Sequence, residues 1–218
     1  MKNIIFIAPP AAGKGTQAKL VSVEYNIPHI STGDLLREEM AKSSEIGISI
    51  KKDMDAGNLV SDEVITTLLK NRITSKDCLN GYILDGYPRN LAQAITYNNL
   101  LEELNYDKGI VIFLDIDKET ALKRTLSRII CQECGSSYNL SIEGLKPLKE
   151  NICDRCNNEL NTRTDDTEEV FIHRFDTYLN STKDLIEYYE NLGLLHKIEV
   201  SNKSVESICE EVKEILND

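Results

Sequence analysis

Four short apolar runs, separated by longer amphipathic stretches, set the pattern of the chain. The runs are NIIFIA at 3–8, YILD at 82–85, GIVIFLDI at 109–116 and LLHKIEV at 194–200. Continuous apolar runs that end in turns are typical of strands covered on both faces of a parallel sheet. Helical periodicity predicts helices over 15–25, 91–104 and 168–192, and a last helix after 200. Strands that alternate with helices predict an α/β fold with a doubly wound parallel sheet.

Another helix start is predicted at STGDLLREEM. Ser31 is followed three residues later by Asp34, as in a capping box whose hydroxyl and carboxylate satisfy exposed backbone N–H groups. The alternation of strands and helices breaks between about 130 and 162, a window rich in Cys, Asn and Gly. We therefore expect an inserted segment there.

Composition limits the classes of partner. The 218 residues suffice for one core with an inserted subdomain, and a net charge of −11 opposes broad attraction to nucleic acid or an anionic membrane. Phosphate binding must therefore be local. The apolar run after Lys2 is too short for a secretory signal and is interrupted by Pro9 and Pro10, so we expect a cytoplasmic protein.

Four of the six cysteines form two C-x-x-C pairs separated by eighteen residues. They are Cys131, Cys134, Cys153 and Cys156. This spacing is typical of a tetrahedral zinc site, and because the protein supplies all four ligands, the zinc is expected to be structural. The alternatives are two disulfides or free thiols in a mobile loop, and disulfides are disfavoured without a secretory signal. Cys78 and Cys209 are isolated and expected to be small apolar fillers.

The stretch IAPPAAGKGTQA, at 7–18, lies where the first strand meets the first helix. A phosphate-binding loop usually reads G-x-x-x-x-G-K-[ST]. Here Gly13 and Lys14 fit, but Ala8 occupies the first glycine position and Gly15 separates Lys14 from Thr16. An ordinary strand-to-helix turn is the alternative interpretation of this fragment.

Four motifs together resemble the adenylate kinase family almost end to end: PPAAGKGTQAKL, STGDLLRE, GYILDGYPRNLAQA and RTDDTEE. Gly-Lys-Gly-Thr resembles that family's own form of the loop. The resemblance implies a five-stranded parallel sheet of the P-loop NTPase type. It also implies a core at 1–30, 61–127 and 164–218, a helical NMP-binding subdomain at 31–60, and a zinc-binding lid at 128–163, as in many bacterial members.

The implied activity is the reversible, magnesium-dependent transfer of a phosphoryl group from ATP to AMP, giving two ADP, by a monomer. The acceptor is a phosphate oxygen already ionised at neutral pH, so this transfer needs positioning and positive charge and no general base. An ionised acceptor therefore predicts arginines, a lysine and Mg²⁺ at the site, with no histidine or cysteine nucleophile. His29, His173 and His196 are expected in packing or surface roles.

The resemblance assigns roles residue by residue. ATP would contact Pro10, Ala11, Ala12, Gly13, Lys14, Gly15, Thr16, Arg124 and Arg128, with Arg124 covering the base. AMP would contact Thr32, Arg37, Gly86, Arg89, Gln93, Arg163 and Arg174. The catalytic groups would be Lys14, Arg89, Arg128, Arg163 and Arg174, while Thr16 and Asp85 would hold magnesium through water. For Asp85, a turn aspartate before Gly86 is the alternative.

Six of the eight arginines thus fall at motif positions, so an acidic chain would concentrate them at one anionic site. Arg124 and Arg128 are expected one turn apart at the end of one helix. Asp165 and Asp166 would orient lid arginines, with a solvated acidic turn as the alternative. The remaining two arginines, Arg72 and Arg155, are expected at the surface.

Two departures and two rival functions complete the sequence evidence. Ala8 and Ala11 replace glycines that the family commonly carries, and a Cβ there is strained if the backbone needs a positive φ; we expect the fold to tolerate both. One rival is a UMP or CMP kinase, against which Thr32, Gln93 and the long lid favour AMP. The other is a non-catalytic zinc-knuckle module, and the negative charge and few aromatic residues oppose nucleic-acid binding by it.

Overall fold

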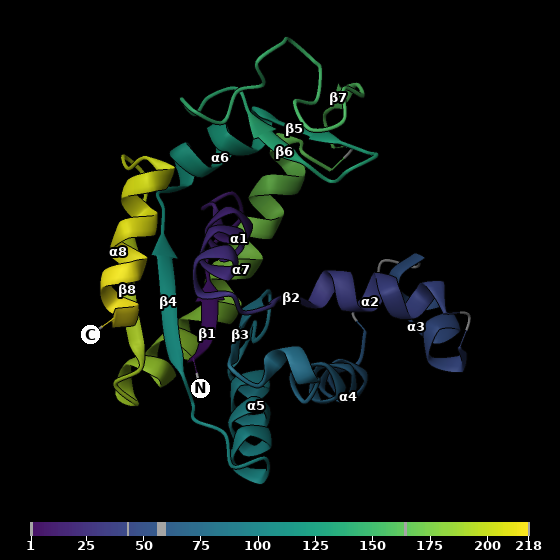
Figure 1. Ribbon diagram of the computed structural model, residues 1–218, viewed down its shortest axis with the longest axis vertical. Coiled ribbons are helices and arrows are strands. Elements are labelled where there is room, and N and C mark those ends of the chain that lie inside the picture. Colours follow the sequence, from purple (N-terminus) through teal and green to yellow (C-terminus); the bar gives the residue numbers. More distant parts are fainter. Residues whose placement is uncertain (1, 43, 56–59, 164, 218) are drawn as a thin grey trace.

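A five-stranded parallel sheet forms the centre of the protein in a computed structural model that describes residues 2–42, 44–55, 60–163 and 165–217 (Figure 1). The strand order is β2-β3-β1-β4-β8, and every neighbouring pair is parallel. The strands are β1 (Lys2–Ile7), β2 (His29–Ser31), β3 (Gly81–Asp85), β4 (Ile110–Asp115) and β8 (Leu195–Glu199). The predicted doubly wound α/β fold is confirmed.

The helices follow the predicted periodicity. They are α1 (Lys14–Tyr25), α2 (Thr32–Ala41), α3 (Glu45–Asp55), α4 (Asp62–Ile73), α5 (Leu91–Glu103), α6 (Lys118–Leu126), α7 (Glu168–Asn191) and α8 (Val205–Asn217), with the 3-10 helix η1 (Lys76–Cys78). The three ranges predicted from periodicity, for α1, α5 and α7, agree to within one residue at each end.

One strand of the sheet has no counterpart among the apolar runs. Strand β2 contains only three residues, of which Ile30 alone is buried, so it carries no run that periodicity could detect. It pairs with β3 at the edge of the sheet, Ile30 opposite Leu84.

Alternating residues of the strands bury against helices on opposite faces of the sheet. Ile4 and Phe6 of β1 belong to a buried cluster with residues of α1 and α8, whereas Ile5 and Ile7 belong to one with residues of α4 and α5. The long helix α7 contributes residues to both clusters. Each fully buried aliphatic side chain of this kind stabilises the fold by about 1.5–3 kcal/mol. The continuous apolar runs are therefore explained by burial on both faces.

The inserted segment forms a second, antiparallel sheet. Its strands are β5 (Arg128–Cys131), β6 (Ser137–Asn139) and β7 (Leu160–Asn161), in the order β6-β5-β7. Figure 1 shows this small sheet beyond the carboxyl end of β4, while α2 and α3 project to one side of the central sheet. The expectation that Arg124 and Arg128 share a helix is wrong, because α6 ends at Leu126 and Arg128 begins β5.

The predicted capping box at α2 is half formed. The hydroxyl of Ser31 accepts a hydrogen bond from the backbone N–H of Asp34 at 3.4 Å. The carboxylate of Asp34 accepts instead from Arg37, one turn further along the helix. A charged guanidinium is a stronger donor than the backbone N–H that a capping box would use.

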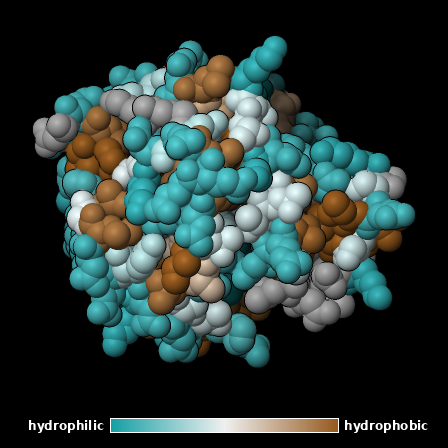
Figure 2. Space-filling model, turned by 90° about the horizontal axis from the view of Figure 1, so that it is seen from below, coloured by the Kyte–Doolittle hydropathy of each residue, from teal (hydrophilic) through white to brown (hydrophobic). Residues whose placement is uncertain are grey.

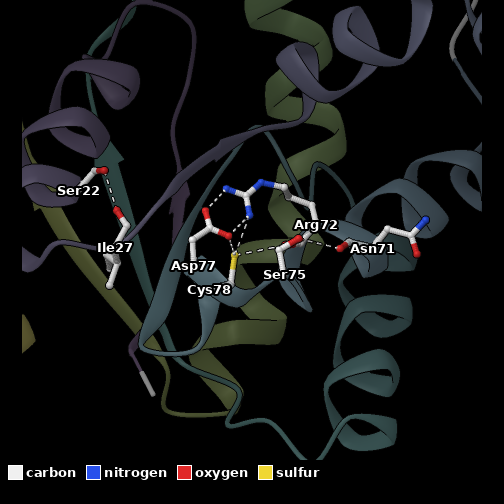
Figure 3. A network of polar contacts seen from close by, with 7 residues as sticks. All are labelled: Ser22, Ile27, Asn71, Arg72, Ser75, Asp77 and Cys78. Atoms are coloured by element: carbon white, nitrogen blue, oxygen red, sulfur yellow. Dashed lines mark hydrogen bonds and ion pairs between the residues drawn. The ribbon is translucent and has the colours of Figure 1, made fainter. Parts of the chain in front are cut away.

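Arg72 was predicted to be a surface residue. In the structure its side chain links the end of α4 to η1 (Figure 3). Its guanidinium donates to both carboxylate oxygens of Asp77, at 2.9 and 2.7 Å, and to the sulfur of Cys78 at 3.0 Å. The hydrogen bond to Asp77 raises the pKa of Arg72, and burial raises the pKa of the Cys78 thiol. Cys78 and Cys209 are buried as expected, and Arg155 is exposed as expected.

Seen from below, the surface is a mixture of hydrophilic residues and separate hydrophobic patches (Figure 2). Among the described residues, no helix has the length and apolar character needed to span a membrane.

Candidate active site

The loop between β1 and α1 has the geometry of an anion site. Gly13 precedes the helix with a φ of 91°, a left-handed conformation that favours glycine. The first-turn N–H groups of a helix lack intrahelical partners and attract anions. Lys14 begins α1, and its ammonium lies 3.2 Å from Oδ1 of Asp85 at the end of β3. The strand-loop-helix context required for phosphate binding is therefore present.

Ala11 carries the strain that its replacement of glycine predicts. Its φ is 61°, in the left-handed region, where a Cβ costs about 1–2 kcal/mol. Ala8 differs, since it is buried in the core beside the sheet and is not among the described residues with positive φ. The loop thus accommodates one alanine without strain and the other with it.

Substituting Ala11→Gly should stabilise the protein by about 1 kcal/mol, because glycine adopts the left-handed conformation without steric cost. The matched control is Ala12→Gly, whose residue is buried and not among the described positive-φ positions. That change should lower stability by at least about 0.5–1 kcal/mol. Denaturant unfolding of the two variants measures both effects. Equal destabilisation by the two glycines would show that Ala11 is unstrained.

The loop faces a cavity of about 1280 Å³, larger than the roughly 300–1,000 Å³ of a site for one drug-sized ligand. Among the described residues, eight lysine and arginine side chains line it: Lys14, Lys19, Arg37, Arg89, Arg124, Arg128, Arg163 and Arg174. The carboxylates described along it are four: Asp34, Asp85, Asp165 and Asp166. Positive charge thus exceeds negative charge here, although the chain carries −11. All six motif arginines do lie around one cavity.

Two carboxylates after the inserted segment hold two of these arginines. The nearly buried carboxylate of Asp166 accepts two hydrogen bonds from Arg128, one of them at 2.8 Å, and Asp165 accepts from Arg174 at 2.7 Å. The predicted contact with a lid arginine is confirmed for Asp166, whereas Asp165 pairs with Arg174 of α7, outside the predicted lid. Arg163 lies near both pairs, and partial desolvation together with the positive charges of Arg128 and Arg174 lowers its pKa.

Asp85 is at the centre of a polar cluster that also contains a histidine. Its Oδ2 lies 3.1 Å from Nε2 of His29, and its Oδ1 faces Lys14. Burial opposes ionisation of Asp85, but the hydrogen bond with His29 and the charge of Lys14 prevail, and its pKa is lowered. The packing or surface role expected for His29 is therefore wrong. The contact of His29 with Asp85 was hard to predict from the sequence, because His29 begins the three-residue strand β2.

Asp85 and Thr16 fit the predicted magnesium site. Both line the cavity beside the loop, and Asp85 supplies the hard, ionised oxygen that Mg²⁺ prefers. The alternative of a simple turn aspartate does not explain why its carboxylate faces Lys14 and His29.

The predicted acceptor residues divide into two groups. Arg37, Gly86 and Arg89 line the cavity with the lid-side arginines Arg163 and Arg174. Thr32 and Gln93 are buried and are not among its described lining residues. The hydroxyl of Thr32 instead donates to the carbonyl of Gly86 at 3.1 Å. A Cβ at Gly86 would lie 3.2 Å from that hydroxyl, which favours glycine there together with its φ of 84°.

Arg124 is held by the turn after β8, a contact that the sequence did not indicate. Its guanidinium donates to the carbonyls of Val200 and Ser201, at 2.9 and 3.3 Å, and burial lowers its pKa. Lys203 of the same turn and Val205, the first residue of α8, line a small cavity beside Arg124 and the phosphate loop. The turn carries no motif, so only the fold could place it here.

The four paired cysteines converge as the spacing predicts. Their sulfur atoms all lie within 4.8 Å of one another. Cys131 and Cys156 are 3.3 Å apart and Cys134 and Cys153 are 3.5 Å apart, and all four are free thiols, so the disulfide alternative is not realised. Four sulfurs at this spacing fit one tetrahedral ion with metal–sulfur bonds of about 2.3 Å. The contact with the Tyr138 hydroxyl lowers the pKa of Cys153, while the pKa of Cys156 in the same cluster is raised, in part by its contact with Cys131.

A parallel sheet with a phosphate loop after its first strand, facing a cavity rich in arginine, defines a P-loop phosphotransferase. The family model described as adenylate kinase matches residues 6–194. Adenylate kinase of Archaeoglobus fulgidus is 44% identical over 98% of this chain and 97% of its own. Those of Clostridium tetani (39%, 98% of each chain) and Bacillus thuringiensis (41%, 90% of each chain) are also similar.

The chain therefore belongs to the adenylate kinase family. It is a nucleoside monophosphate kinase that transfers the terminal phosphoryl group of ATP to AMP. Both rival functions, the UMP or CMP kinase and the zinc-knuckle module without catalysis, are therefore wrong.

Proposed function

We propose that two nucleotides lie end to end in the large cavity, with ATP on the phosphate loop and AMP between the loop and α2. The single observation that carries this proposal is that the loop and the six motif arginines, which come from six different elements and loops, line one cavity. On the ATP side we place residues 10–16, Arg124 and Arg128. On the AMP side we place Thr32, Arg37, Gly86, Arg89, Gln93, Arg163 and Arg174.

The transfer requires no proton movement. An ionised phosphate oxygen of AMP attacks the γ-phosphorus of ATP, a new P–O bond forms, and the bond to the β-phosphate oxygen breaks, releasing ADP. Lys14 and the N–H groups of the loop hold the donor phosphates, while Arg89, Arg128, Arg163 and Arg174 neutralise charge on the transferring group. Mg²⁺, held through water by Thr16 and Asp85, would add positive charge at the donor phosphates.

Domain movement completes the site. We assign 1–30, 61–127 and 164–218 to the core, 31–60 to the NMP-binding subdomain and 128–163 to the lid; Met1, Ser43, 56–59, Thr164 and Asp218 lie outside the described residues. Thr32 and Gln93 are not among the described residues that line the cavity, and closure of the NMP-binding subdomain would bring AMP into contact with both. Closure of the two mobile parts excludes water, which would otherwise accept the phosphoryl group.

The four cysteines hold one Zn²⁺, which orders the lid and takes no part in the chemistry because it has no open position. We further propose that the enzyme acts as a cytoplasmic monomer and contacts neither nucleic acid nor membrane.

Coupled assays of ADP formation with AMP, GMP, UMP and CMP side by side test the acceptor. We expect AMP to give the highest kcat/KM by at least about a hundredfold, since buried polar groups left without partners penalise other bases. Turnover should disappear without Mg²⁺, and elemental analysis should find one zinc per chain. Preference for UMP or CMP would contradict the proposal and support a pyrimidine nucleotide kinase.

A further inference from the structure

The amide of Gln93 is held at both ends by groups of opposite hydrogen-bonding character. Its Oε1 accepts from the backbone N–H of Arg89 at 2.8 Å, and its Nε2 donates to Oδ1 of Asp62 at 2.7 Å. Gln93 lies in the first turn of α5 and Asp62 in the first turn of α4, so the second contact joins two helices. Asp62 carries no role in the mechanism given above.

We propose that Asp62 is a specificity-determining positioning residue, which holds the Gln93 amide in the one orientation that pairs with a 6-aminopurine and rejects a 6-oxopurine. The inference rests on the proposed contact between Gln93 and the base of AMP. The effect of Asp62 on the base is therefore indirect, since it selects the base through the orientation of a neighbouring amide.

Asp62 affects only the orientation of the Gln93 amide, because other hydrogen bonds already fix the main chain of Gln93. Its backbone N–H donates to Oδ1 of Asn90 at 2.9 Å, and its carbonyl accepts from the hydroxyl of Tyr87 at 3.3 Å. The side chain itself is only 7% exposed. An amide in such a place has two orientations, related by a half-turn about its last bond.

The two partners of the amide allow only one of these orientations. A backbone N–H can only donate, and an ionised carboxylate can only accept. A half-turn would place the amide NH₂ against the N–H of Arg89 and the amide oxygen against the carboxylate of Asp62. Both hydrogen bonds would be lost and like partial charges would face each other, with the larger penalty at the charged group.

The fixed orientation distinguishes purines by the edge they present. Adenine offers an acceptor at N1 and a donor at its 6-amino group, whereas hypoxanthine offers a donor at N1 and an acceptor at O6. Each end of the amide can form one further hydrogen bond: Oε1 can accept one at its second lone pair, and Nε2 can donate its second hydrogen. The held amide complements adenine, and only the flipped amide complements hypoxanthine. Asp62 thus disfavours binding of hypoxanthine as well as favouring binding of adenine.

The test compares AMP with IMP, which differ only at this edge, in the variants Asp62→Asn and Asp62→Ala. An asparagine can turn its own amide and accompany a flip of Gln93, and alanine removes the acceptor. We expect the ratio of kcat/KM for AMP to that for IMP to fall at least about tenfold in both variants, which corresponds to about 1.4 kcal/mol. The matched control is Glu63→Gln, which removes the same charge from the next residue, exposed like Asp62 but without its hydrogen bond to Gln93, and should leave the ratio unchanged.

Gln93→Leu separates this inference from the site on which it rests. If Gln93→Leu leaves the use of AMP unchanged, the base contact itself is wrong. If it lowers the use of AMP while both Asp62 variants keep the wild-type ratio within about twofold, the contact stands and the orienting role is refuted. Equal losses with AMP and IMP in the Asp62 variants would also overturn the proposal, because a purely structural role lowers both together.

Discussion

Substituting Lys14→Met should lower kcat/KM for ADP formation from ATP and AMP by about a thousandfold. Lys14 begins α1 beside the loop. Its ammonium faces Asp85, where it can neutralise charge on the donor phosphates. Methionine keeps the length and apolar stem of the side chain but removes its charge. Steady-state assays at saturating Mg²⁺ measure the loss.

The control for Lys14→Met is Lys70→Met, which removes the same charge from α4. Lys70 pairs with Glu103 at 2.6 Å and is not among the residues lining the cavity. Its substitution should change kcat/KM less than about twofold, because Lys70 does not line the cavity. Loss of its exposed ion pair should cost only about 0–1 kcal/mol of stability. Similar losses in the two variants would indicate a general effect of net charge and not a local role for Lys14.

Removing the metal from the four-cysteine cluster should unfold the lid and leave the core folded. The buried cluster of this segment consists of Ile129, Cys131, Cys153 and Leu160, so half of its members are predicted ligands. Without metal, two buried aliphatic side chains cannot offset the conformational entropy of 128–163. Hydrogen exchange after chelation should show lost protection in the lid and unchanged protection in β1 and β4.

Cys153→Ser should reproduce the effect of the chelator, and Cys209→Ser serves as its control. Cys209 is a buried free thiol on α8, outside the cluster. Its substitution should leave exchange in the lid as in the wild type. A lid that keeps its protection in Cys153→Ser protein would contradict a structural metal site.

A structural feature could be predicted from the sequence only where it produces a local pattern of residues. Strands β1, β3 and β4 are covered by helices on both faces, so they left apolar runs that periodicity could detect. Strand β2 is an edge strand with one buried residue, and it left none. The cysteine pairs were predictable because metal geometry fixes their spacing.

Contacts between distant segments were the part that the sequence could not give. His29 meets Asp85 only because β2 and β3 are neighbours in the sheet. Gln93 meets Asp62 only because α4 and α5 bring their first turns together. Arg72 is a local case: it was expected at the surface because it lies outside the motifs, and the turn that brings Asp77 to it was not predicted.

The central claim is that positioning and positive charge suffice for phosphoryl transfer between two bound nucleotides. The most direct test is a rapid-quench measurement of a single turnover in Lys14→Met and Arg89→Met proteins saturated with both nucleotides. The transfer step itself should slow by at least about a hundredfold in each variant, since each loses a charge held against the transferring group. Transfer at the wild-type rate in both saturated variants would contradict the claim.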